Sequence, residues 1–205
     1  MTVSVPATSL PCSHPDAEAA VAGILAALEL RQPGSCEHAE RVADAALALT
    51  HAVDPCLAAQ EGIAHAYLLH DIGKLGVPDG IVLKPARLTS SERRIMETHT
   101  TLGEEMVRRL HVFPPLVRDV VAFHHERWDG RGYPHGLGAW AIPLAARILA
   151  VVDAFDAMTH ERPYRAAQPS SWALAELKRC SGAQFDPAVV EAFLRLQPAC
   201  SEVSG

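Results

Sequence analysis

The chain has 205 residues, of which 49% are hydrophobic and 20% are charged, as expected for a globular protein with one well-buried core. Its formal net charge of -6, with histidine counted as neutral, argues against a nucleic-acid polymer or an anionic membrane surface as a partner. No apolar run reaches the roughly 18 residues of a membrane span, and residues 1–15 lack a signal-peptide pattern.

Apolar residues recur at helical spacing along most of the chain, and no alternating β pattern is longer than a few residues. Proline, glycine and capping residues mark where the segments begin and end. The predicted fold class is therefore all-α, with a loop at residues 75–88. The predicted helices occupy residues 16–30, 35–51, 54–70, 90–110 with a break near 100–103, 114–125, 144–158, 170–180 and 186–196.

The chain is predicted to form one domain over residues 16–197. Prolines among serines and threonines make residues 1–15 a flexible leader, and residues 198–205 form a frayed tail. Within the domain, an N-terminal helix and turn at 16–34 precede a core at 35–197. The five cysteines are scattered without a Cys-x-x-Cys pair, so we expect reduced thiols and a cytoplasmic location.

One carboxylate lies where the pattern predicts a buried position. Asp153 occurs in the apolar helix 144–158, which has no polar face and is predicted to lie at the centre of the fold. Burying an unpaired carboxylate costs several kcal/mol or protonates the group. The sequence therefore predicts a cation beside Asp153, whereas Asp156, one helical turn later, is more consistent with a supporting or capping role.

Two further segments combine histidine with carboxylate or with a second histidine. His70-Asp71 ends an apolar helix, and an Asp there can bridge two cations with its two oxygens. His124-His125 places two polar rings side by side, and each needs a partner. Metal ligation satisfies both rings of the pair. The alternative is one buried, hydrogen-bonded ring and one ring in water.

Motifs in order along the chain resemble those of the HD-GYP phosphodiesterases, a branch of the HD metal-dependent phosphohydrolases. The resemblance covers roughly residues 35–196. The matching segments are His38 with Arg41-Val42-Ala43, Leu68-Leu69-His70-Asp71-Ile72-Gly73-Lys74, Pro85 to Leu88, Met96 with His99, His124-His125-Glu126-Arg127-Trp128-Asp129-Gly130-Arg131-Gly132-Tyr133-Pro134, Ile142-Pro143, Arg147 to Asp156, Arg162-Pro163-Tyr164-Arg165 and Gly182-Ala183-Gln184-Phe185-Asp186-Pro187.

This resemblance implies an HD-domain helical bundle with additional C-terminal helices and a metal centre of Fe or Mn. It also implies hydrolysis of cyclic di-GMP to linear pGpG, GMP or both, by a hydroxide that bridges two metal ions. Imidazole together with carboxylate suits Fe, Mn or Zn better than Mg or Ca. By position, one metal would be held by His38, His70, Asp71 and Asp153, and a second by Asp71, His99, His124 and His125.

The metal count follows from one departure from the family pattern. Family members with a third metal tend to carry a Glu four residues before the first ligand histidine, and here that position is Gly34. Glu37 is adjacent to His38 and would point elsewhere on a helix. We therefore expect two divalent metal ions per chain.

The resemblance also assigns residues to catalysis and substrate binding. Asp71 and Lys74 would be catalytic, with the Lys74 ammonium on a phosphate oxygen, and Arg162 and Arg165 would grip phosphate through their planar guanidinium groups. Without the resemblance, solvated surface positions account equally well for Lys74 and better for both arginines. Two further substrate-binding residues, Gly132 and Tyr133, belong to a turn that resembles a cavity wall, in which Gly132 would allow an unusual backbone conformation.

Other functions remain open at this stage. The substrate could be another cyclic dinucleotide, or the chain could be a catalytically weak HD-GYP module that binds a cyclic dinucleotide or a signalling partner. The seven expected ligands favour the enzyme. Residues 1–34 leave no room for a sensory domain, so we expect either a free-standing enzyme or a regulator on a separate chain. A diguanylate cyclase domain is a possible partner, and homodimerisation through the first helix is plausible.

Overall fold

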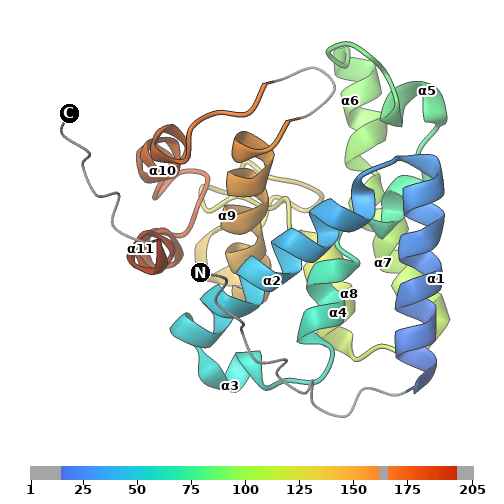
Figure 1. Cartoon of the computed structure of the whole chain (residues 1–205), viewed down its shortest axis with the longest axis horizontal. Coiled ribbons are helices and arrows are strands. Elements are labelled where there is room, and N and C mark those ends of the chain that lie inside the picture. Colours follow the sequence, from blue (N-terminus) through green and yellow to red (C-terminus); the bar gives the residue numbers. More distant parts are fainter. Residues whose placement is uncertain (1–14, 162–165, 198–205) are drawn as a thin grey trace, which may run out of the picture.

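The computed structural model describes residues 15–161 and 166–197, and the regular elements in these ranges are all helices (Figure 1). The prediction of an all-α fold is confirmed. None of these helices is both long and apolar enough to cross a bilayer. The elements are α1 (Pro15–Arg31), α2 (Ser35–Val53), α3 (Pro55–Ala58), α4 (Ile63–Leu68), the 3₁₀ turn η1 (Ile72–Gly76), α5 (Asp79–Val82), α6 (Ser90–Glu97), α7 (His99–Leu110), α8 (Pro115–Phe123), the 3₁₀ turn η2 (Ala139–Ala141), α9 (Leu144–Thr159), α10 (Ser170–Arg179) and α11 (Pro187–Leu196).

Helices α2 and α9 form the centre of the bundle (Figure 1). On one side α4 packs on α2 and α8, and α7 packs on α8 and η1; α1 lies against α2 and η1. On the other side α10 and α11 pack against α9, and α11 also contacts α2. The expected bundle with additional C-terminal helices is therefore present, and the C-terminal helices cover the face of α9 that would otherwise be exposed.

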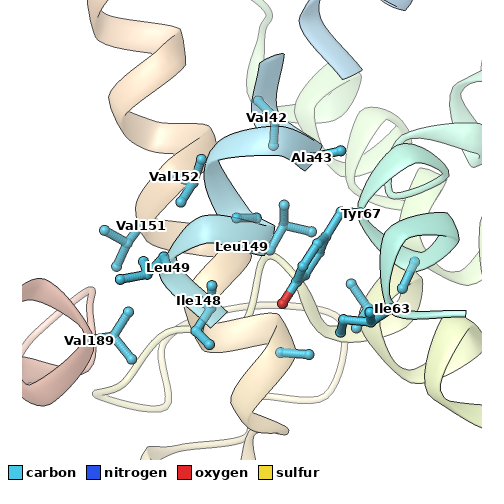
Figure 2. Close-up of a cluster of buried hydrophobic side chains, with 14 of the residues drawn as sticks. Val42, Ala43, Leu49, Ile63, Tyr67, Ile148, Leu149, Val151, Val152 and Val189 are labelled. Carbon is cyan, nitrogen blue, oxygen red and sulfur yellow. The ribbon is translucent and has the colours of Figure 1, made fainter. Parts of the chain in front are cut away.

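The hydrophobic core lies around α9, in agreement with the central position predicted for the apolar helix 144–158. Ile148, Leu149 and Val151 of α9 are fully buried. They belong to one apolar cluster with Leu49 of α2 and Tyr67 of α4 (Figure 2). The Tyr67 hydroxyl lies 2.6 Å from the Thr50 hydroxyl, which satisfies the polar end of an otherwise buried ring.

Three details of the predicted elements were wrong. The helix expected at 54–70 is divided into α3 and α4, because Gly62 adopts a left-handed conformation with φ of 81° at the start of α4. The break expected at 100–103 lies instead at Thr98, whose hydroxyl bonds the carbonyl of Ile95 between α6 and α7. The loop at 75–88 contains the single turn α5 and the end of η1.

The tightest backbone contact in the fold lies between η1 and α7. A Cβ on Gly73 would sit 1.7 Å from the carbonyl oxygen of His99 and 2.5 Å from the nitrogen of Gly103. On the other side of η1, Arg31 of α1 donates to the carbonyl of Lys74 at 2.5 Å. Because Gly73 lies between Asp71 and Lys74 and touches His99, this contact determines how closely these segments approach.

We predict that Gly73→Ala destabilises the protein by at least about 1–3 kcal/mol, because its methyl group overlaps the backbone of α7. Gly80→Ala on α5 is the matched control, because nothing lies within 4 Å of its Cβ. The control should raise the free energy of unfolding by no more than about 1 kcal/mol, because alanine fits this position and restricts the unfolded chain. Urea denaturation of both variants tests this, and equal effects would contradict the packing argument.

Candidate metal centre

The histidines expected to act together come from four helices that converge on one point. His38 lies in α2, His70 follows α4, His99 begins α7, and His124 follows α8 with His125. Ring centroids are 5.6 Å apart for His38 and His70, 5.4 Å for His70 and His124, and 5.3 Å for His99 and His124. Residues up to 87 positions apart in the sequence therefore form one continuous cluster of imidazoles.

Asp71 lies within this cluster and directs its two oxygens to different imidazoles. Oδ2 is 3.4 Å from Nε2 of His70, whereas Oδ1 is 3.5 Å from Nε2 of His99 and 4.0 Å from Nε2 of His124. Two groups of potential metal donors, each spanning no more than 4.8 Å, result from this arrangement. Asp71 belongs to both, the first group being His38, His70 and Asp71 and the second Asp71, His99, His124 and His125.

A hydrogen bond to the backbone orients three of the rings in the same way. Nδ1 of His70, His99 and His124 lies 2.7–2.9 Å from the backbone carbonyl three residues earlier. A carbonyl only accepts hydrogen bonds, so Nδ1 carries the proton and Nε2 is left with a lone pair directed at the cluster. Among the described residues, His70 Nε2 is a buried nitrogen without a hydrogen-bond partner. These orientations fit a metal ion in the cluster.

A carboxylate network orients His38 instead. Nδ1 of His38 lies 2.6 Å from Oδ2 of Asp156, and Arg41 donates from Nε to Oδ1 of Asp156 at 2.9 Å. On the other side of the ring, Nε2 of His38 is 3.4 Å from Oδ1 of Asp153. Asp153 thus faces the cluster, and Asp156 lies behind His38. The contact between Arg41 and Asp156 was not foreseen, although the i, i+3 spacing of His38 and Arg41 could have suggested it.

Burial keeps the second group of rings neutral. It lowers the pKa of His99 and of His124, and it lowers the pKa of His125 to about 3. Burial alone would raise the pKa of Asp71, but Lys74 and His70 outweigh it and hold that pKa well below its usual range. Neutral imidazoles around an ionised carboxylate are the protonation states that metal binding needs.

His38 titrates differently from the other rings. Burial alone would lower its pKa, but hydrogen bonds to Asp153 and Asp156 outweigh burial and raise it to about 9 in the metal-free protein. The pKa of Asp153 is in turn held far below its usual range, because His38 and His70 outweigh the effect of burial. Asp153, predicted to need a cation, therefore has one in the His38 imidazolium when no metal is present.

Lys74 lies beside the cluster, as expected. Its Nζ is 2.5 Å from Oδ2 of Asp71, and its side chain is only 24% exposed. A cavity of about 360 Å³ opens next to it. Its walls come from the turn between α1 and α2, including Gln32, Pro33 and Gly34, and from His38 and Lys74. The turn at 32–34, predicted only as a helix break, is thus part of the site.

Tyr133 forms another wall of the site, since its ring centroid is 4.9 Å from that of His125. Gly132 does not have the unusual backbone that was expected, because its φ is not positive. Its constraint is proximity: a Cβ there would lie 2.4 Å from the nitrogen of Arg127. Arg162 and Arg165 lie outside the described residues.

Comparison with known proteins gives matches of three kinds: a family model, named relatives and solved structures. A model of the family described as HD domain matches residues 24–189. A cyclic di-GMP phosphodiesterase of Thermotoga maritima is 45% identical over 69% of this chain and 39% of its own length. The cyclic di-GMP phosphodiesterase response regulator RpfG of Xanthomonas campestris is 38% identical over 87% of this chain and 48% of its own length.

A relative named for another substrate and a solved structure complete the comparison. The 3'3'-cGAMP-specific phosphodiesterase 3 of Vibrio cholerae is 37% identical over 84% of this chain and 36% of its own length. An HDG"Y"P protein from Bdellovibrio bacteriovorus superposes with a TM-score of 0.64 over 86% of this chain and 60% of that chain, at 18% identity, which shows the fold. This chain spans less than half the length of the three relatives.

We predict that Asp156→Asn lowers the pKa of His38 from about 9 towards 6.5 in metal-free protein, because one of two stabilising carboxylates is lost. His38 has a raised folded-state pKa, so its contribution to stability is complete below pH 6.5 and disappears as the pH rises through 9. The variant should therefore be destabilised at pH 6 more than at pH 10. NMR titration of the ring and denaturation at both pH values measure these effects.

The matched control is Asp44→Asn on the exposed side of α2. It should leave both the His38 titration and its pH-dependent stability unchanged. A His38 pKa that stays near 9 in Asp156→Asn would contradict the network described above.

Proposed function

Since this chain belongs to the HD domain family, we propose that it is a metal-dependent phosphodiesterase that hydrolyses cyclic di-GMP. The relatives named for this activity support the proposal, although each is more than twice as long as the matched region. The observation that carries it is the position of Asp71, whose two oxygens face two different groups of donor nitrogens. A carboxylate shared in this way suits a centre with two cations.

We assign His38, His70, Asp71 and Asp153 to one metal ion and Asp71, His99, His124 and His125 to the other. The buried, unpartnered Nε2 of His70 supports this assignment. Imidazole mixed with carboxylate favours Fe or Mn. When bound, two such cations would make water a hydroxide nucleophile at neutral pH and compensate the charge on the phosphate.

The other residues of the site would position the substrate. Lys74 is close enough to the cluster for its ammonium to contact a non-bridging phosphate oxygen, and its pairing with Asp71 holds it there. The cavity beside His38 would take up the part of the dinucleotide next to the scissile phosphate. Tyr133 would close the side of the site at His125, and Arg162 and Arg165, outside the described residues, would bind phosphate.

A second substrate deserves testing in parallel. The Vibrio cholerae relative named as specific for 3'3'-cGAMP favours a mixed dinucleotide as the alternative. A catalytically weak module is disfavoured, because the chain retains all seven proposed ligands. A cyclase domain or separate regulator as partner, a homodimer and a cytoplasmic location stay predictions; the described cysteines, Cys36, Cys56 and Cys180, are free thiols.

We predict that protein reconstituted with Fe or Mn hydrolyses cyclic di-GMP, and that Asp71→Ala reduces kcat/KM by at least about 10³-fold, because both donor groups lose the carboxylate they share. The assay should be run with and without oxygen and should include 3'3'-cGAMP and cyclic di-AMP. Faster hydrolysis of 3'3'-cGAMP would reassign the substrate. Full activity in Asp71→Ala would contradict the proposed centre.

We also predict two tightly bound metal ions per chain, because Gly34 stands where a third ion would need a carboxylate. A Cβ at Gly34 would have nothing within 4 Å. Elemental analysis of purified protein after exhaustive dialysis measures the ratio. Three tightly bound ions per chain would refute this prediction.

Lys74→Ala should raise KM or lower kcat by roughly 10- to 100-fold while leaving the metal content unchanged, because a phosphate contact is lost but no ligand is. Lys84→Ala is the matched control, since Lys84 pairs with Glu92 at 2.6 Å away from the cluster. The control should leave the kinetics unchanged. Loss of metal from Lys74→Ala would show that Lys74 supports the ligands instead of the substrate.

A further inference from the structure

Glu126 is a buried carboxyl group that the proposed chemistry does not use. It follows His125 directly, and only 3% of its surface is exposed. Its Oε1 accepts a hydrogen bond from the backbone nitrogen of His135 at 2.7 Å, nine residues later. Its Oε2 is buried without a hydrogen-bond partner. Burying a carboxyl group that is only half satisfied costs free energy, so an apolar side chain would be the more stable choice at this position.

The bond from Glu126 closes a loop that places Tyr133 on the site. The backbone nitrogen of Tyr133 donates to the carbonyl of His125 at 3.3 Å, and two residues later His135 is bonded to Glu126. Between these two bonds the Tyr133 ring lies 4.9 Å from the His125 ring and 6.3 Å from the His99 ring. Tyr133 is thus held from both sides.

An antiparallel β-bridge between Asp129 and Gly138 closes the base of this loop, outside the contact with Glu126. Gly130 and Gly136 flank it with left-handed φ values of 73° and 68°, and Gly136 is exposed. The His135 ring packs edge-on against Phe123 at 5.7 Å. Gly132 packs against the backbone of Arg127, and between Gly132 and the bridge the backbone is held at His135. Glu126 accepts the hydrogen bond that holds this part of the loop.

We propose that Glu126 is a positioning residue, which holds the 130–136 loop closed so that Tyr133 stays against His125 and His99 as a wall of the substrate site. The positioning role rests on the geometry above. Its consequence for substrate rests on the proposed function. The role requires only one acceptor oxygen, so the glutamine variant should hold the loop as glutamate does, whereas the alanine variant should not.

Hydrogen exchange measured by mass spectrometry tests the positioning role without any substrate. Peptides covering 130–136 should exchange roughly 3- to 10-fold faster in Glu126→Ala, the factor expected for the loss of one hydrogen bond, and at the wild-type rate in Glu126→Gln. Limited trypsin cleavage after the exposed Arg131 should increase in the alanine variant alone. The control is Val189→Ala, which removes buried volume on α11 away from the loop. It should lower Tm without changing exchange in the loop.

Kinetics then test the consequence. Glu126→Ala should raise KM for the dinucleotide by about 10-fold, with kcat within about 2-fold of wild type and metal content unchanged, because Tyr133 moves but the ligands remain. Glu126→Gln should behave as wild type. Unchanged exchange in the alanine variant, or a glutamine variant as impaired as alanine, would overturn the proposal. Wild-type protein that hydrolyses no dinucleotide would overturn the proposed function, whereas the expected exchange result would still support the positioning role.

Discussion

The site depends on the close approach of two backbones, at Gly73 and His99, which brings one carboxylate between two sets of imidazoles. Asp71 precedes Gly73 by two residues, and the absence of a side chain at Gly73 lets η1 lie directly on α7. Oδ1 of Asp71 then reaches His99, while Oδ2 stays beside His70. Any residue larger than glycine would move the carboxylate away from one set and leave the buried imidazoles without their shared anion.

The two donor groups differ in charge, and the difference follows from their surroundings. The group on the α2 side combines Asp71 with His70 and His38. His38 also contacts Asp153 and Asp156, and Asp156 accepts a hydrogen bond from Arg41. The group on the α7 and α8 side has three imidazoles, whose pKa values burial holds down, and shares Asp71 as its carboxylate. One end of the centre therefore holds carboxylates paired with cationic side chains, and the other is mainly a neutral nitrogen surface.

The segment between α10 and α11 supports the loop that follows His124 and His125. Arg147 of α9 bonds Asp186 at the start of α11 and lies 5.8 Å from the Trp128 ring. The nitrogen of Trp128 donates to the carbonyl of Gln184 at 3.1 Å. Trp128 thus packs the loop against the core.

Local patterns were sufficient to predict the helical class, the central position of the helix at 144–158 and the residues that gather at the cluster. Helical periodicity and helix caps depend only on residues that are close in the sequence, so they can be recognised without the fold. Asp153 could be recognised as well, because a carboxylate among aliphatic residues needs a partner wherever it is buried. Local patterns did not predict the helix breaks at Gly62 and Thr98. The left-handed backbone of Gly62 and the hydrogen bond of the Thr98 side chain interrupt helices whose composition would allow them to continue.

Contacts between segments that are distant in the sequence could be seen only in the tertiary structure. The order of residues could not reveal that Asp156 and Arg41, 115 positions apart, meet behind His38, or that Glu126 reaches His135. Nor could it reveal that Gly132 is required by proximity and not by its backbone angles. These features depend on distances and directions between elements, which the packing of α2, α7, α8 and α9 sets and no single segment encodes.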